Sequence, residues 1–277
     1  MMKYRLLALD IDGTLLNDNR HVTDASIAAI QRAVDAGVYV TLCTGRSIST
    51  AAHVARRLPL NAPLVLNGGA LIYDSLRRRA LYIRNLSKSV ALHAVHQLRN
   101  LVCYPIVYAP LPESQYFYYD DYDPHNASFR QYIENNTGRA HMVEDVTHFL
   151  WHDAAMVAIT DRVARIQDLA PSICNQLRKT TITLEVSPID RAYCHVTVTP
   201  PGISKGNGLR ELSILSGVDL SETIAVGDNL NDLDMLSTAG LGVAMGNATP
   251  EAKAQADYVT GSNNEDGVAQ VIERFIL

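Results

Sequence analysis

Two aspartates stand two residues apart, directly after a short apolar run. Asp10 and Asp12 follow the apolar residues 6–9, and Gly13 comes next. Such a run is typical of a buried parallel strand, and residues two apart on a strand share a face. We therefore expect both carboxylates to project toward one site at the carboxyl end of this strand, where open α/β sheets bind ligands. The pair could hold Mg²⁺ or divide nucleophilic and acid–base roles, with a solvated acidic turn as the alternative.

A second acidic cluster occupies residues 227–232 and follows the apolar strand predicted at 223–226. Asp228 could supply another oxygen ligand, while Asn231 and Asp232 are expected in the first turn of the next helix. Alternatively, Asp228 or Asn229 only caps that helix. Two acidic clusters at equivalent strand ends favour a shared metal site over coincidence.

Two further elements gain meaning only beside these clusters. Thr44-Gly45-Arg46 lies between a predicted strand and a predicted helix, and a hydroxyl with backbone N–H groups at a helix start can bind an anion. Lys205 begins a helix predicted at 205–215. Alone, the first is a common turn and the second is a common surface charge.

Together and in this order, the four segments resemble the four motifs of the haloacid dehalogenase superfamily. The chain is most similar to the Cof-type sugar-phosphatase branch, and residues 67–69, 202–206 and 240–248 support this resemblance. The likeness is clear at both ends of the chain. In the middle, it rests on the size and position of an insertion, which fits the large α/β "C2" cap of this branch.

The resemblance implies a magnesium-dependent phosphatase that works through an aspartyl-phosphate. Asp10 would attack phosphorus, Asp12 would protonate the leaving alcohol and then activate water, and Lys205 would offset negative charge. In relatives, Mg²⁺ is held by the carboxylates that correspond to Asp10 and Asp228 and by the backbone carbonyl that corresponds to Asp12. Asp232 would be a further or outer ligand.

The same resemblance assigns the phosphate and substrate contacts. Thr44, the Gly45 N–H and Asn231 would bind the phosphoryl oxygens. Arg46 is a candidate substrate contact on the core, and Tyr122 and His125 are candidates from the cap. Many relatives carry a glutamate near the place where this chain has His195, so their substrates are a limited guide.

The predicted elements that position these residues form an α/β fold. Strands alternate with helices in residues 1–83 and 198–277, which predicts a Rossmann-like core with a mostly parallel sheet. The expected strands of this core are 6–9, 38–42, 64–66, 223–226, 241–245 and 258–260. Residues 84–197 read as an inserted α+β cap domain of the C2 type.

Bulk properties agree with a soluble enzyme. The chain has 277 residues, of which 47% are hydrophobic and 19% charged, with a net charge of −5. We therefore expect no nucleic-acid partner and no membrane patch. The four cysteines are widely spaced, and the apolar run near Met1 is too short for a signal peptide. A cytoplasmic monomer or homodimer is expected.

The predicted function is hydrolysis of a small phosphorylated metabolite, in particular a sugar phosphate. A phosphohexomutase of the same superfamily and a non-catalytic phospholigand-binding protein are the alternatives.

Overall fold

The computed structural model describes residues 3–113, 116–150, 152–187 and 190–277. Within it the chain folds into two compact units. One unit, the core, combines Met1–Ile83 with Ile203–Leu277, and the other, the inserted domain, is Arg84–Gly202. From the sequence, the chain was expected to return from the inserted domain to the core at residue 198, but Val198 lies inside strand β11 (Tyr193–Thr199) of the inserted domain.

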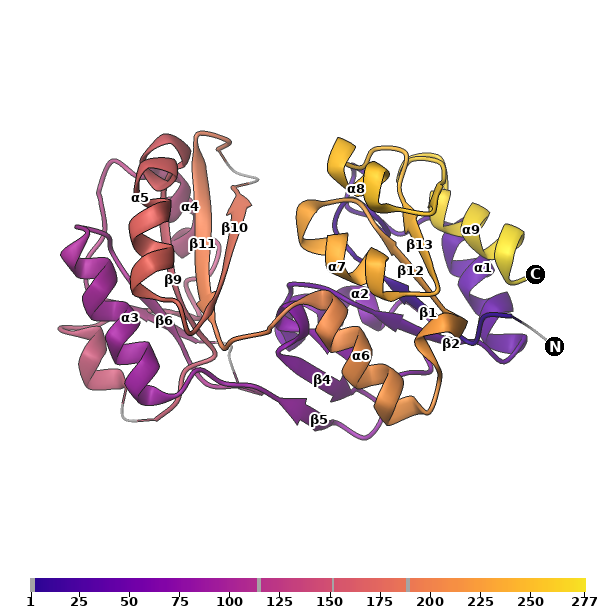
Figure 1. Ribbon diagram of the computed structural model, residues 1–277, viewed down its shortest axis with the longest axis horizontal. Helices are drawn as coiled ribbons and strands as arrows, with labels where there is room; N and C mark the ends of the chain where they lie inside the picture. The colour runs from indigo at the N-terminus through magenta and orange to yellow at the C-terminus, as the bar shows by residue number, and fades with distance from the viewer. Residues whose placement is uncertain (1–2, 114–115, 151, 188–189) are drawn as a thin grey trace. The chain divides into compact units, whose positions relative to one another are not determined.

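A five-stranded parallel sheet forms the centre of the core (Figure 1). Its strand order is β14-β13-β12-β1-β2. The predicted Rossmann-like sheet is confirmed. In chain order the strands are β1 (Leu6–Leu9), β2 (Tyr39–Leu42), β12 (Thr223–Gly227), β13 (Leu241–Ala244) and β14 (Tyr258–Val259).

Helices and short turns connect these strands. Thr23 is the N-cap of helix α1, where its side chain accepts from the Ser26 N–H, and the helix buries Ala29 and Ile30 against the core. Helices α1 and α9 pack against each other, as do α6 and α7. The helices of the core are α1 (Asp24–Asp35), α2 (Ile48–Ala55), α6 (Lys205–Ser216), α7 (Leu233–Thr238), α8 (Pro250–Gln255) and α9 (Gly267–Phe275), and its 3₁₀ turns are Asn67–Gly69, Leu220–Glu222 and Leu230–Asp232.

The expected third strand of the parallel sheet lies elsewhere. Strand β3 (Leu64–Leu66) pairs antiparallel with β4 (Leu71–Asp74), which pairs with β5 (Arg79–Ile83) in a separate small sheet. Among the described residues, β3 approaches the parallel sheet through an isolated bridge between Cys43, which follows β2, and Val65. The chain reverses after β3 because Asn67, Gly68 and Gly69 all have positive φ. The next strand therefore returns beside β3 rather than crossing over a helix.

The inserted domain is built on one mixed sheet of order β10-β11-β9-β6-β7-β8, as the α+β prediction requires. Side chains of α3 and α5, among them Leu98 and Ile166, pack with Val157 and Val196 in its core. Phe129 and Tyr132 of α4 meet the rings of β7. The elements are α3 (Lys88–Asn100), β6 (Ile106–Tyr108), β7 (Phe117–Tyr119), α4 (Ala127–Glu134), β8 (Ala140–Met142), a 3₁₀ turn (Val146–Phe149), β9 (Met156–Arg162), α5 (Val163–Gln176), β10 (Thr181–Val186) and β11 (Tyr193–Thr199).

Candidate active site

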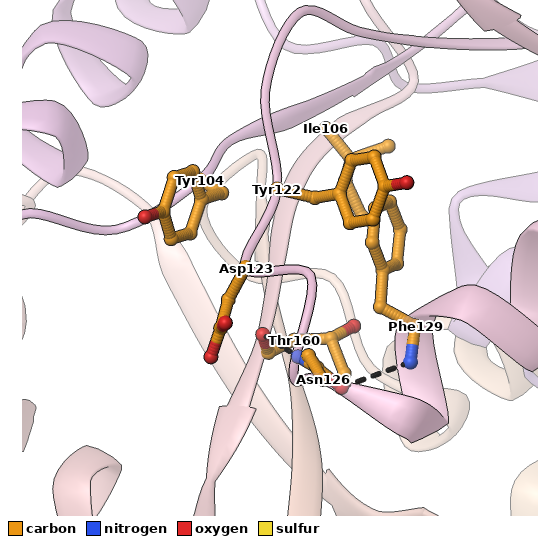
Figure 2. A pocket seen from close by; sticks show the side chains of 7 residues that line it. All are labelled: Tyr104, Ile106, Tyr122, Asp123, Asn126, Phe129 and Thr160. Atoms are coloured by element: carbon orange, nitrogen blue, oxygen red, sulfur yellow. Dashed lines mark hydrogen bonds between the residues drawn. The ribbon is translucent and has the colours of Figure 1, made fainter.

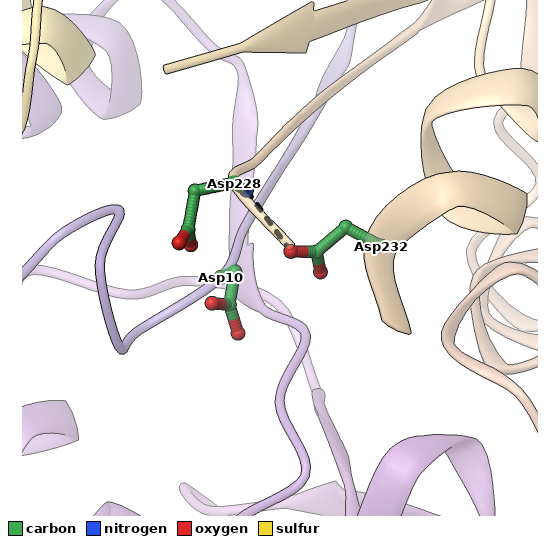
Figure 3. A group of neighbouring side chains, drawn as sticks. All are labelled: Asp10, Asp228 and Asp232. Carbon is green, nitrogen blue, oxygen red and sulfur yellow. Dashed lines mark hydrogen bonds between the residues drawn. The ribbon is translucent and has the colours of Figure 1, made fainter. Parts of the chain in front are cut away.

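Three carboxylates converge where two neighbouring strands end. Strand β1 pairs in parallel with β12, with Leu9 opposite Val226, so the residues that follow each strand emerge at one edge of the sheet. Asp10, Asp228 and Asp232 lie at that edge, and each offers an oxygen within 4.8 Å of the others. Figure 3 shows the three side chains as close neighbours. The structure thus brings together residues more than 210 positions apart in the chain, as two acidic clusters at equivalent strand ends predict.

Lys205 ties two of these carboxylates together. Its Nζ donates to Asp10 Oδ1 at 2.7 Å and to Asp232 Oδ1 at 2.6 Å, and the side chain is only 3% exposed. Burial lowers the pKa of Lys205, but the charges of Asp10 and Asp232 outweigh it and raise the pKa above its usual value. Lys205 is therefore a fixed cation, which excludes the surface-charge interpretation.

The loop after β12 holds Asp232 in one orientation. Asp232 Oδ2 accepts hydrogen bonds from the N–H groups of Asp228 and Asn229, both at 3.0 Å. Gly227 leaves the necessary space, since a Cβ there would lie 2.6 Å from Asp232 Cβ. Because Lys205 occupies Oδ1, both oxygens of Asp232 already have donors. This geometry suits a residue that orients its neighbours better than a direct metal ligand.

Asp10 and Asp228 have the environment expected of metal ligands. Burial raises the pKa of Asp10, Lys205 opposes this, and Asp232 adds to it. Burial, with Asp232 next, raises the pKa of Asp228 to about 6. Three carboxylates share one ammonium here, so two negative charges stay uncompensated when all are ionised. A divalent cation bound to carboxylate oxygens would balance them, so the residues fit Mg²⁺.

The Asp12 side chain is paired with an arginine of the core. It is 63% exposed, and a guanidinium fork from Arg46 binds it: Nε donates to Oδ2 at 2.8 Å and Nη2 to Oδ1 at 2.6 Å. Strand β1 ends at Leu9, and Gly13 has a φ of +77°, so strand alternation does not extend to Asp12. Asp12 still lies near enough to contribute to the raised pKa of Asp228.

Arg46, predicted as a substrate contact, is bound to other residues of the core in this structure, and its contact with substrate stays a prediction. Besides its two bonds to Asp12, Nη1 donates to the Thr50 carbonyl of α2 at 3.1 Å. A bidentate pair between arginine and a carboxylate fixes both distance and orientation. Arg46 therefore holds the Asp12 carboxylate relative to α2.

The predicted phosphate-binding residues follow the neighbouring strand. Strand β2 lies beside β1, with Leu42 opposite Leu9, which places Thr44 at the same edge as Asp10. Thr44 is buried and its hydroxyl accepts from Arg46 N at 3.2 Å, whereas Gly45 is exposed. Asn231 lies in the 3₁₀ turn Leu230–Asp232 at the end of β12. Their phosphate contacts remain predictions.

Two residues that sequence reasoning did not assign complete the site. Buried Thr14 donates from Oγ1 to Asp228 Oδ1 at 2.9 Å. Asp234 Oδ2 accepts from Gly206 N at 3.1 Å and so anchors the helix that carries Lys205. Thr14 stands within the first motif, where its hydroxyl could have indicated a contact, but nothing in the sequence pairs Asp234 with Gly206.

The two candidates of the inserted domain lie beside acidic residues of their own domain: Tyr122 N–H donates to Asp121 Oδ1 at 2.8 Å, and His125 N–H donates to Asp123 Oδ1 at 2.8 Å. Tyr122 lines a small pocket, and Asn126 in its wall caps α4 and donates to the Thr160 carbonyl (Figure 2). His125 is exposed and its carbonyl accepts from Tyr193. Substrate contact by Tyr122 or His125 stays a prediction. The pocket is lined by Tyr104, Ile106, Tyr122, Asp123, Asn126, Phe129 and Thr160.

Comparisons with known proteins identify relatives along nearly the whole chain. A family profile for haloacid dehalogenase-like hydrolases matches residues 7–272. The 5-amino-6-(5-phospho-D-ribitylamino)uracil phosphatase YcsE of Bacillus subtilis is 32% identical, over 99% of this chain and 96% of its own length. The pyridoxal phosphate phosphatase YbhA of Escherichia coli is 27% identical over the full length of both.

A solved structure has the same fold. The crystal structure of a haloacid dehalogenase-like hydrolase from Bacteroides thetaiotaomicron superposes with a TM-score of 0.80 at 26% identity, covering 98% of this chain and 99% of the other. Among the residues described here, no helix has both the length and the apolar character needed to cross a membrane.

Proposed function

The chain belongs to the haloacid dehalogenase-like hydrolases, and we propose that it is a magnesium-dependent phosphatase that hydrolyses a small phosphorylated metabolite through Asp10. The resemblance to Cof-type phosphatases seen in the motifs is confirmed, and the enzyme class is that of a hydrolase of phosphoric monoesters. The proposal concerns the metal, the intermediate and the substrate.

One observation carries the proposal: a buried, lysine-bound carboxylate beside two others at the edge of a parallel sheet. Asp10 is 5% exposed and bonded to Lys205, and Asp228 lies within 4.8 Å. Burying several carboxylates close together costs free energy unless their negative charge is balanced by a bound cation. A carboxylate that attacks an anionic phosphate needs positive groups beside it, such as Lys205 and a bound cation, because the two anions repel each other.

The proposed reaction has two displacements at phosphorus. An Asp10 oxygen bonds to phosphorus and the ester oxygen departs, with the proton of Asp12 completing the alcohol. A water molecule then transfers a proton to Asp12 and attacks the phosphorus of the aspartyl-phosphate. The bond between phosphorus and the Asp10 oxygen breaks, which releases phosphate and regenerates Asp10. Mg²⁺ held by Asp10, Asp228 and the Asp12 carbonyl would neutralise charge on the phosphoryl oxygens.

The remaining residues bind and orient. Lys205 keeps Asp10 close to a positive charge throughout, while Thr44, the Gly45 N–H and Asn231 bind phosphoryl oxygens. Arg46 orients Asp12 through its fork and stays our candidate for a substrate contact on the core.

For the substrate, we propose a phosphate ester on the terminal carbon of a sugar or sugar-alcohol chain. The relative YcsE is named for a substrate with a phosphorylated ribityl chain, which supports this class. The enzyme is expected to work in the cytoplasm, as a monomer or homodimer and without a nucleic-acid partner.

Phosphate release from a panel of esters tests the proposal. The panel contains ribose 5-phosphate, glucose 6-phosphate, pyridoxal 5′-phosphate and an aryl phosphate, each with Mg²⁺ and with EDTA. Magnesium-dependent release of phosphate, fastest from a sugar-type ester, is expected. Isomerised sugar phosphate without free phosphate would indicate a mutase, and no turnover of any ester would contradict an enzymatic role.

A further inference from the structure

Asn247 bridges two loops that the catalytic roles above do not connect. It follows β13 in the segment Gly246-Asn247-Ala248. Its Nδ2 donates to the Gly13 carbonyl at 2.8 Å, and its Oδ1 accepts from the N–H of Asn263 at 2.9 Å. One side chain thereby joins the loop after Asp10 to the loop before α9.

Asn263 extends the same connection. It is buried, and its Nδ2 donates to the Leu16 carbonyl at 3.0 Å and to Asp18 Oδ1 at 3.2 Å. The loop of residues 13–18 is therefore anchored at its start by Asn247 and at its end by Asn263. A loop tied at both ends by side-chain amides is held more rigidly than its irregular backbone alone would allow.

The start of this loop lies directly against Asp228. Gly13 has a φ of +77°, and a Cβ on it would lie 2.3 Å from Asp228 Oδ2. The next residue, Thr14, donates to Asp228 Oδ1 at 2.9 Å. Both carboxylate oxygens of Asp228 therefore face the two residues that follow Asp12, and a small shift of Gly13 must shift or crowd this carboxylate.

We propose that Asn247 is a positioning residue for the cation site. By holding the Gly13 carbonyl, it keeps residues 12–14 at the distance from Asp228 that a shared cation requires. The proposal rests on the proposed function, because it assumes that Asp228 and Asp10 bind Mg²⁺. Loss of one partly exposed hydrogen bond of this kind is expected to weaken cation binding by about 3- to 10-fold.

The test measures cation binding without turnover. Mn²⁺ binding to the full chain is followed by the electron paramagnetic resonance of free Mn²⁺, for wild type, Asn247→Ala and Asn264→Ala. Asn264 is the matched control because both of its hydrogen bonds to this loop lie at the far end, at exposed Asp18: Nδ2 donates to Asp18 Oδ2 at 2.9 Å, and Oδ1 accepts from the Asp18 N–H at 3.1 Å. Thermal unfolding of each metal-free variant reports its stability.

The expected result is a Mn²⁺ dissociation constant about 3- to 10-fold higher for Asn247→Ala, with the control within about twofold of wild type. Asn247→Ser, which shortens the side chain, should act in the same direction and replaces Asn247→Ala if that variant does not fold. Equal dissociation constants for the Asn247 and Asn264 variants would overturn the proposal. A wild type that binds no Mn²⁺ would instead overturn the proposed function.

Discussion

Replacing Lys205 with methionine removes a cation that the structure places between two buried carboxylates. Methionine keeps most of the length of the side chain but cannot donate to Asp10 or Asp232. These carboxylate side chains are 6% and 0% exposed, so water cannot replace the lost donors without rearrangement. Removing one partner of a buried ion pair destabilises a protein by about 3–5 kcal/mol.

That loss is large enough to measure by thermal unfolding. For a chain of this size, about 1 kcal/mol corresponds to a shift in Tm of roughly 2–4 °C. Lys205→Met should therefore lower the Tm of the metal-free protein, in EDTA at pH 7.5, by about 6–20 °C. The exposed Lys179 supplies the control, and Lys179→Met should shift Tm by less than about 2 °C.

A second substitution separates charge from packing. Asp232→Asn removes one of the unpaired charges but keeps an oxygen able to accept from the N–H groups of Asp228 and Asn229. Adding it to Lys205→Met should restore part of the lost stability, because one buried charge fewer needs a partner. Equal Tm values for Lys205→Met and Lys179→Met would refute the reasoning, as would a double variant less stable than the two single losses predict together.

Three further predictions concern other groups. Arg46→Lys keeps the positive charge but loses the two hydrogen bonds of the guanidinium to Asp12, so kcat should fall about 10-fold for an alkyl phosphate. The fall should be smaller for an aryl phosphate, because its leaving group needs little assistance from an acid. Equal losses for both esters would count against a role of Arg46 in positioning Asp12. Gly13→Ala places a Cβ against Asp228 at a residue with a positive φ. Calorimetric titration should therefore show weaker Mg²⁺ binding, and denaturant unfolding should show a free energy of unfolding lower by about 1–3 kcal/mol. Unchanged values of both would contradict the close contact. Burial lowers the pKa of His195 to about 4, against 6.5 for an unperturbed histidine, so as pH falls the imidazole is protonated in the unfolded chain before it is protonated in the folded one. Between pH 7 and 4, the free energy of unfolding measured in urea should therefore fall by about 1–3 kcal/mol more for wild type than for His195→Asn. Parallel pH profiles of the two proteins would refute the lowered pKa.

Local pattern was sufficient for most of the core. The strand predicted at 6–9 has those bounds in the structure, and the helix predicted at 205–215 extends one residue further to Ser216, since apolar periodicity and the glycine at 217 mark these elements. The convergence of Asp10 and Asp228 was also predictable, because both residues follow parallel strands and such strands share their carboxyl edge. These inferences need only short segments and the geometry of a parallel sheet.

Pairings set by turns and long side chains were not predictable in this way. Strand β3 reads like any short parallel strand, and only the positive-φ turn after it decides that its partner is β4. The guanidinium group of Arg46 binds Asp12, which lies 34 positions earlier in the chain, and no periodicity of the sequence relates the two residues. The role of Asn247 likewise depends on two loops whose approach is visible only in three dimensions.

The most direct test of the central assignment is detection of phosphate on Asp10. Protein mixed with substrate and Mg²⁺ is quenched in acid within milliseconds, digested, and searched by mass spectrometry for an aspartyl-phosphate. The account predicts phosphate on the peptide that contains Asp10 in wild type and none in Asp10→Asn, together with loss of turnover. Normal turnover by Asp10→Asn, or phosphate carried by another residue, would contradict it.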